Sequence, residues 1–180
     1  MADVEHERRC PLDGDSGVIE ARLAKNTMVA SLAAFALLAA YNNIADYDSN
    51  FAFVRHVLSM DTTFPGNALK HRAVTAPGLW HAAYWCIIAG EALTGLAFAA
   101  GAAEMARHLR AEGGRFQRSK RFVHLGAALG FLVWFFGFVV VGGEWFAMWQ
   151  SREWNGQQAA FRLVATILGV LVFVAQRDDG

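Results

Sequence analysis

The sequence predicts an all-α membrane protein, a polytopic four-helix bundle with a helical extramembrane cap in its first outer loop. Apolar residues make up 55% of the 180 residues and concentrate in four blocks, each close to the ~20 residues that cross a hydrocarbon layer of about 30 Å. None of these blocks carries the charged face that a soluble amphipathic helix repeats every turn. Lysine and arginine are also unevenly divided between the connecting segments, which is typical of a membrane protein with a fixed orientation.

The predicted domain boundaries follow these blocks. The first 26 residues carry ten charges and no apolar run, so we expect a charged cytoplasmic tail at 1–26 and no cleaved signal peptide. A four-helix transmembrane domain then covers 27–176, and a short C-terminal tail covers 177–180. Within the domain, the spans are predicted at about 27–45, 78–100, 122–141 and 158–175, the outer loops at 46–77 and 142–157, and a basic inner loop at 107–121.

The distribution of lysine and arginine predicts that both termini are cytoplasmic. Cytoplasmic flanks of membrane spans retain basic residues. Eleven of these residues lie in the two tails and the inner loop, whereas four lie in the outer loops. We therefore expect a multi-pass protein of a bacterial inner membrane, N-in and C-in. Contact with anionic lipid explains the basic inner loop, and we expect no nucleic-acid partner.

The second span carries the most informative polar face. Pro77 suits the first turn of a helix. His81, Tyr84 and Glu91 then fall within about 80° of one another around the helix, and Glu91 lies about 20 Å in from Gly78. A charged carboxylate at that depth is costly unless it is paired or protonated. The three residues form a candidate intramembrane polar site with two open interpretations: a site for a proton, cation or polar ligand, or a neutral glutamic acid that fixes helix packing.

A second candidate site is a polar cluster near the outer surface. Arg162 begins the fourth span, Glu144 ends the third, and Asn42 and Asn43 end the first. These residues are predicted at similar depth, near His81. An ion pair and amide network would fix the helix register there, and a small-molecule site needs the same groups. Both interpretations remain open.

Helix packing and interfacial anchoring explain most other distinctive residues of the spans. Gly126, Gly130 and Gly137 lie within about 40° of one another on a helix, and such a smooth strip lets another helix approach closely. The first span offers small residues for this contact, namely Ala33, Ala36 and Ala40. Aromatic belts mark membrane–water boundaries, and four tryptophans fit such a belt at the outer side: Trp80, Trp145, Trp149 and Trp154.

The first outer loop is predicted to contain a short helix. About thirty residues is long for a connection without structure of its own. Phe51, Val54 and Leu58 recur at helical spacing within it. We expect this helix to lie at the interface or to cap the bundle.

Known catalytic motifs are absent from the sequence. It contains no Gly-rich phosphate loop, H-E-x-x-H, C-x-x-C or G-x-S-x-G pattern, so no catalytic residue is proposed. His81 and His124 lie near opposite ends of their spans and cannot share one haem iron, which leaves His81 with His56 as the feasible pair. We expect no haem and no metal, although a bound lipid is compatible with the sequence.

Three stretches together resemble a known family. They are "NNIADYDSNFAFVRHVLSMDTTFPGN", "YWCIIAGEALTG" and "GFVVVGGEWFAMWQSREWNGQQAAFR". They are similar to a bacterial family of predicted small integral membrane proteins, a domain-of-unknown-function family found mainly in proteobacteria. The resemblance covers about Lys25 to Val174 and implies four transmembrane helices in the inner membrane. It brings no catalytic residue, and Met1 to Ala24 lie outside it.

These observations lead to three functional hypotheses. The first is a non-catalytic accessory or stabilising subunit of a larger membrane protein complex, with the bilayer and other membrane subunits as partners. The second is a small-ligand or ion- or proton-coupled binding or transport protein that uses Glu91. The third is a membrane anchor that binds haem or a quinone.

Overall fold

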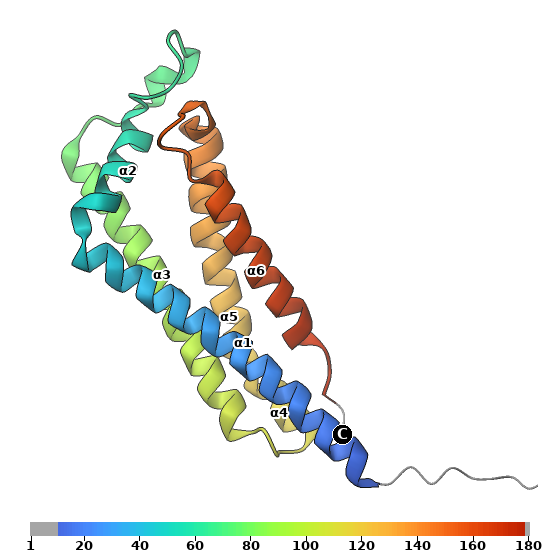
Figure 1. Ribbon diagram of the computed structural model, residues 1–180. Coiled ribbons are helices and arrows are strands. Elements are labelled where there is room, and N and C mark those ends of the chain that lie inside the picture. The colour runs from blue at the N-terminus through green and yellow to red at the C-terminus, as the bar shows by residue number, and fades with distance from the viewer. Residues whose placement is uncertain (1–10, 179–180) are drawn as a thin grey trace, which may run out of the picture.

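The computed structural model describes residues 11–178, with side chains from Ser16 onward (Figure 1). Within that range every regular element is a helix. Four helical segments are long and apolar enough to cross a membrane: Ser16–Ala45, Pro77–Arg107, Gly113–Trp145 and Gln157–Ala175. The predicted all-α fold with four spans is therefore confirmed.

Nine helical elements make up the described chain. The spans are α1 (Pro11–Ala45), α3 (Pro77–Arg107), the composite of α4 (Gly113–Ser119), α5 (Arg121–Gly130) and η2 (Phe131–Trp145), and α6 (Gln157–Ala175). The first connection contains α2 (Tyr47–Ser59) and η1 (Ala68–Arg72), and the last contains η3 (Met148–Gln150). A short helix thus occupies the position where the apolar spacing of the first loop predicts one.

The first helix begins well before the predicted span. It starts at Pro11 rather than near Thr27, so much of the segment expected as a charged tail continues the helix. Arg22 and Lys25 lie on this extension and are only 4% and 2% exposed. Charged residues can be buried there because the other helices supply hydrogen-bond partners, which are described below.

The third span changes its backbone geometry at Phe131. The fifteen residues of η2 form a π-helix, which is wider than an α-helix, and at its end the Phe146 amide donates to the Val141 carbonyl oxygen over 3.0 Å. Such wide turns are rare and usually short, and they often occur at functional sites. The sequence pattern of this span did not indicate the change.

The spans form two pairs that meet at one end of the molecule. Helix α1 packs mainly on α3, which also contacts α5, whereas α6 packs mainly on η2. In Figure 1 the two pairs lie close together near α4 and diverge toward α2. We call the end at α4 the closed end and the end at α2 the open end.

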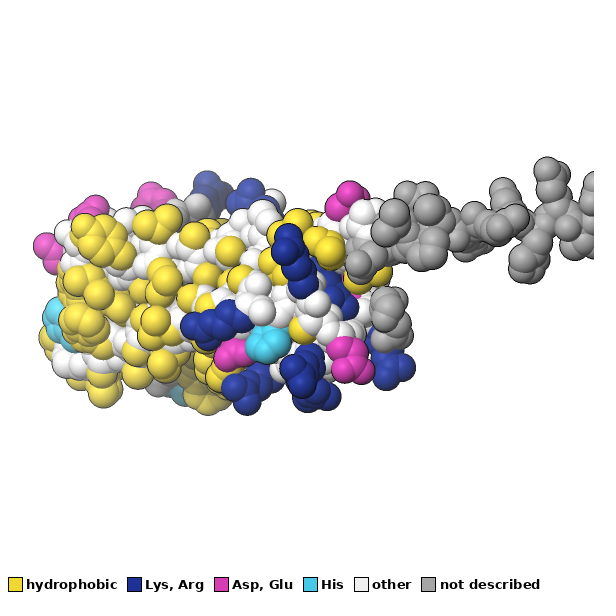
Figure 2. All heavy atoms as spheres, turned by 90° about the horizontal axis from the view of Figure 1, so that it is seen from below, with side chains coloured by type: hydrophobic (Ala, Val, Ile, Leu, Met, Phe, Trp, Pro, Cys, Tyr) yellow, Lys and Arg dark blue, Asp and Glu magenta, His cyan; other side chains and the backbone are white. Residues whose placement is uncertain are grey.

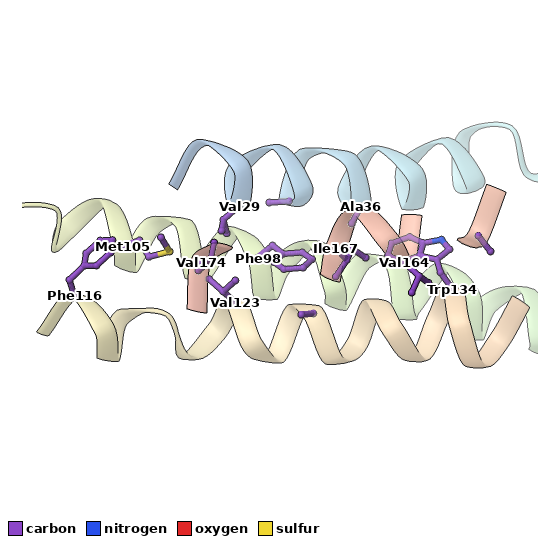
Figure 3. Close-up of a cluster of buried hydrophobic side chains, with 13 residues drawn as sticks. Val29, Ala36, Phe98, Met105, Phe116, Val123, Trp134, Val164, Ile167 and Val174 are labelled. Atoms are coloured by element: carbon purple, nitrogen blue, oxygen red, sulfur yellow. The ribbon is translucent and has the colours of Figure 1, made fainter. Parts of the chain in front are cut away.

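The main apolar core fills the closed end and the middle of the bundle. Phe98 of α3 lies in this core with Val29 of α1, Val123 of α5 and Ile167 of α6, and all four are at most 4% exposed (Figure 3). Toward the open end, this core extends as far as Trp134. Beyond Trp134 the packing separates into smaller clusters around α2 and η3.

The glycines of the third span contact different partners from those predicted. A methyl group on Gly126 would lie 2.8 Å from the ring of Phe98, and one on Gly130 would lie 2.9 Å from Ile167. A methyl group on Gly137 would meet only the Leu132 carbonyl oxygen, at 3.6 Å. Two of the three glycines therefore permit close contact with α3 and α6, rather than with the alanines of the first span.

Candidate functional site

A hydrogen-bond network that is buried except at Asn50 surrounds Asn43 near the open end. The Asn43 amide donates to Glu91 Oε2 over 2.7 Å, and Asn43 Oδ1 accepts from the Asn50 amide over 2.6 Å. The Tyr84 hydroxyl donates to the Asn43 backbone oxygen over 3.1 Å. Asn43, Tyr84 and Glu91 are 7%, 1% and 4% exposed. We call Asn43, Asn50, Tyr84 and Glu91 the Asn43 network. The network joins α1, α2 and α3.

Glu91 has a neutral partner in this network. Within the described residues, no lysine, arginine or histidine forms an ion pair with it. Asn43 is the donor that reaches its carboxyl group in the same part of the chain. An apolar environment favours the protonated form of a carboxyl group unless a cation approaches. The group can therefore donate a hydrogen bond or accept a cationic partner.

A cavity of about 490 Å³ lies beside the network. This volume falls in the range of about 300–1,000 Å³ that small-molecule sites occupy. Glu91, Tyr84 and three asparagines supply its polar lining, and Trp134, Phe138 and Leu163 are among its apolar walls. Asn50, Phe53 and Val54 of α2 also line it, so α2 forms the wall at the open end.

A second hollow lies next to this cavity, between α1 and α6. It measures about 320 Å³ and shares Phe35, Trp134 and Leu163 with the cavity. Its hydroxyl groups, on Thr27, Ser31 and Thr166, are each bonded to the carbonyl oxygen four residues earlier. The walls therefore behave as apolar surface, and we call this hollow the α1–α6 groove.

Two of the three residues of the predicted intramembrane site come together, as their helical spacing predicts. Tyr84 and Glu91 both reach Asn43, but His81 is exposed and does not line the cavity. Its Nδ1 lies 2.8 Å from the Tyr47 hydroxyl, and its ring stacks on Phe51 at 4.1 Å between centroids. His81 thus belongs to an aromatic cluster beside α2, which also contains Tyr84.

The four residues of the predicted outer cluster are not brought together. Glu144, Arg162 and Asn42 are exposed, and no ion pair or hydrogen bond between them is present in the described part of the chain. Asn43 is buried and bonds to Glu91 instead. The sequence correctly indicated Asn43 as a polar residue at this depth, but its carboxyl partner is Glu91 and not Glu144. The reason is that Glu91 faces the interior whereas Glu144 ends η2 at the surface.

The tryptophans of the predicted belt lie around the open end. Trp145 and Trp149 are 54% and 50% exposed. Trp154 stacks on His56 at 4.6 Å, and the indole of Trp80 donates to the Val74 carbonyl oxygen over 2.8 Å. Trp145 and Trp149 are thus exposed at the surface. Trp154 and Trp80 also contact residues of the first outer loop.

The histidines considered for haem or metal have other contacts. His56 Nδ1 lies 2.8 Å from an Asp61 carboxylate oxygen and stacks on Trp154, whereas His81 stacks on Phe51. Among the residues with described positions, no group of three or more His, Cys, Asp and Glu side chains is arranged to hold a metal ion.

A second buried polar cluster lies at the closed end, and the sequence did not predict it. The Asp178 carboxylate accepts from Lys25 Nζ over 2.7 Å and from Lys120 Nζ over 2.5 Å. Arg22 donates to the backbone oxygens of Leu109, Ala111 and Asp178 over 2.7–2.9 Å. We call Arg22, Lys25, Lys120 and Asp178 the C-terminal clasp, because it fastens the segment after α6 to α1 and to the junction between α4 and α5.

The charge of Asp178 is stabilised by its two lysines. Burial alone would raise the pKa of this carboxyl group, but hydrogen bonds and attraction from Lys120 and Lys25 outweigh burial and lower the pKa below its ordinary value of 3.8. Asp178 is therefore ionised in the folded protein at neutral pH, and the clasp is a network of paired charges.

Comparison with family models identifies the chain. Residues 21–177 match the family described as predicted small integral membrane protein (DUF2165). The protein belongs to this family. The match begins slightly before the predicted limit at Lys25 and takes in all four residues of the Asn43 network and most of the clasp. Comparisons with curated proteins and with solved structures find no match.

Proposed function

We propose that this member of the family binds a small lipid-soluble ligand whose polar end interacts with Glu91. The observation that carries the proposal is the buried carboxyl group with a neutral partner at the wall of a cavity of about 490 Å³. A structural carboxyl group gains most from complete pairing. One that borders a cavity keeps hydrogen-bonding capacity for a ligand.

The α1–α6 groove supports a ligand that arrives from the bilayer. The groove adjoins the cavity, shares three wall residues with it and has apolar walls. An alkyl or isoprenoid chain fits such a passage, while a hydroxyl, amine or carbonyl group at its end would reach the Asn43 network. Quinones and other neutral amphiphiles belong to this class.

The inner membrane of a bacterium is the location we propose for this binding. Its support is the excess of lysine and arginine at the closed end, which favours a cytoplasmic position for that end. Both termini would then face the cytoplasm, and the cavity would lie nearer the outer leaflet.

The test is the identity of what copurifies with the protein. Wild type, Glu91→Gln and Glu144→Gln would be extracted in mild detergent, and bound small molecules would be measured by mass spectrometry after delipidation. Glu144 is the matched control because it is exposed and does not line the cavity. We expect wild type and Glu144→Gln to retain one amphiphile, and Glu91→Gln to retain at least about tenfold less, equivalent to about 1.4 kcal/mol. Equal retention by a folded Glu91→Gln protein would refute the proposal, and a Soret band would assign the site to haem.

An accessory subunit remains a second candidate function. The observation that favours it is the same α1–α6 groove, because a partner's transmembrane helix with small side chains could also fill it. Native-level purification in mild detergent distinguishes the two. A stoichiometric protein partner that is lost on Ser31→Leu substitution would support the subunit, whereas an isolated chain carrying an amphiphile would support the binding protein.

A further inference from the structure

We propose that the closed end carries a binding site for the phosphate of an anionic phospholipid headgroup. The site is a hollow of about 410 Å³ lined by Glu104 of α3, His108 directly after α3, Arg115, Arg118 and Ser119 of α4, and Arg121 of α5. It is separate from the cavity at Glu91 and does not depend on the function proposed there.

Three guanidinium groups of this hollow have no anionic partner among the residues that the structure describes. No carboxylate lies within ion-pair distance of Arg115, Arg118 or Arg121 in the described chain. Arg121 lies over the ring of Phe122, at 4.6 Å from its centroid. The three arginines follow one another at intervals of three residues, so each is a neighbour of the next on the helix surface, and all three line the hollow. Guanidinium groups bind phosphate oxygens in a bidentate manner.

The carboxylate that lines the hollow belongs to Glu104, and it already has two partners at the end of α3. Glu104 lies 3.8 Å from Arg107 and 3.8 Å from His108. The His108 ring bonds to the Glu104 backbone oxygen over 2.8 Å. Three arginines and one glutamate leave an excess of two positive charges around the hollow, which suits an anion.

The surroundings of the hollow favour a lipid over a soluble phosphate. Leu125 follows Arg121 by one helical turn and is 49% exposed, and Leu132 continues the same direction at 56% exposed. Figure 2 shows basic side chains gathered next to a broad hydrophobic area on the face seen from below. A phosphodiester held by the arginines would thus place its acyl chains over an apolar surface. Basic pockets at the ends of membrane helices bind anionic headgroups in this way.

The distribution of arginines provides a matched control for the test. Arg110 and Arg177 are exposed and do not line the hollow, and neither forms an ion pair with a carboxylate in the described part of the chain. The variant R118Q/R121Q removes two lining charges, and R110Q/R177Q removes the same amount of charge outside the hollow. Any effect of charge on membrane orientation is therefore shared by both variants.

Lipid retention would be measured by native mass spectrometry of the full-length protein with phosphatidylglycerol and with phosphatidylcholine. We expect wild type and R110Q/R177Q to retain phosphatidylglycerol through delipidation, and folded R118Q/R121Q to retain about tenfold less. R118K/R121K, which keeps the charge, should recover most of the retention. Equal retention by the two glutamine variants, or equal retention of phosphatidylcholine, would overturn the proposal. Displacement of phosphatidylglycerol by millimolar inorganic phosphate would overturn the assignment to lipid.

Discussion

Two buried polar clusters hold this bundle at opposite ends, and they differ in how their carboxyl groups are satisfied. In the C-terminal clasp, Asp178 receives two lysines. In the Asn43 network, Glu91 receives one neutral amide and borders a cavity. Both carboxyl groups are at least nine-tenths buried. The two clusters therefore differ in the hydrogen-bond partners of their carboxyl groups and not in the extent of burial.

This difference distinguishes a structural role from a binding role. Paired charges inside a protein leave little capacity for a further partner, and removing one of them exposes the remaining charges to an apolar environment. A carboxyl group with one neutral partner loses less when that partner is removed, and it can still bind a ligand. The clasp should therefore control stability, while the Asn43 network should control occupancy of the cavity.

The largest expected effect is on the stability of the clasp. Asp178→Asn leaves Lys25 and Lys120 buried without their carboxylate, so it should destabilise the protein by about 3 kcal/mol, or lower Tm by about 6–12 °C. Thermal unfolding in detergent measures the change. Asp61→Asn is the control, because the Asp61 side chain, which pairs with His56, is 47% exposed and the pair should contribute less than about 1 kcal/mol. Similar Tm values for the two variants would show that the clasp is not a stabilising network.

Loss of the amide at position 43 should have a smaller effect on stability. Asn43→Ala removes the hydrogen bonds to Glu91 and from Asn50 but keeps the backbone oxygen that accepts from Tyr84. We expect a cost of about 1 kcal/mol, because hydrogen bonds between membrane helices are weak on average. Tm measured beside Asn50→Ala, which keeps the bond to Glu91, checks this value. A loss as large as that of Asp178→Asn would remove the distinction between the two clusters.

The smallest expected effect is the pH dependence that Asp178 contributes. Its pKa in the folded protein is lowered below 3.8. Its stabilising contribution is therefore complete above that value and is lost as the pH falls through the lower pKa of the folded state. The difference in Tm between wild type and Asp178→Asn should thus be constant from about pH 7 to about pH 5 and shrink below about pH 4. A difference that grows as the solution becomes acidic would contradict the assignment.

The sequence was sufficient to predict the four spans because each is a long apolar block. It also predicted that Tyr84 and Glu91 share one interior face, since helical spacing fixes the direction of both side chains. It did not predict that Asn43 is the partner of Glu91. Asn42 and Asn43 are adjacent, and small differences in helix rotation decide which of them faces inward.

The clasp escaped prediction for a different reason. Arg22, Lys25 and Lys120 look like ordinary basic flanks when only the sequence is considered. Lys25 meets Asp178 across 153 positions of the chain, and no local pattern encodes such a contact. The π geometry of η2 is similarly absent from the pattern, because an apolar run shows little periodicity when most of its residues are large and hydrophobic.

The α1–α6 groove affects how the affinity of any ligand of the cavity should be expressed. A molecule that reaches Glu91 through the groove is drawn from the lipid phase, so its relevant concentration is a mole fraction in the bilayer rather than a molarity in water. A sparingly soluble compound can then saturate the cavity at a modest intrinsic affinity. Dilution with detergent would weaken apparent binding without any change in the protein.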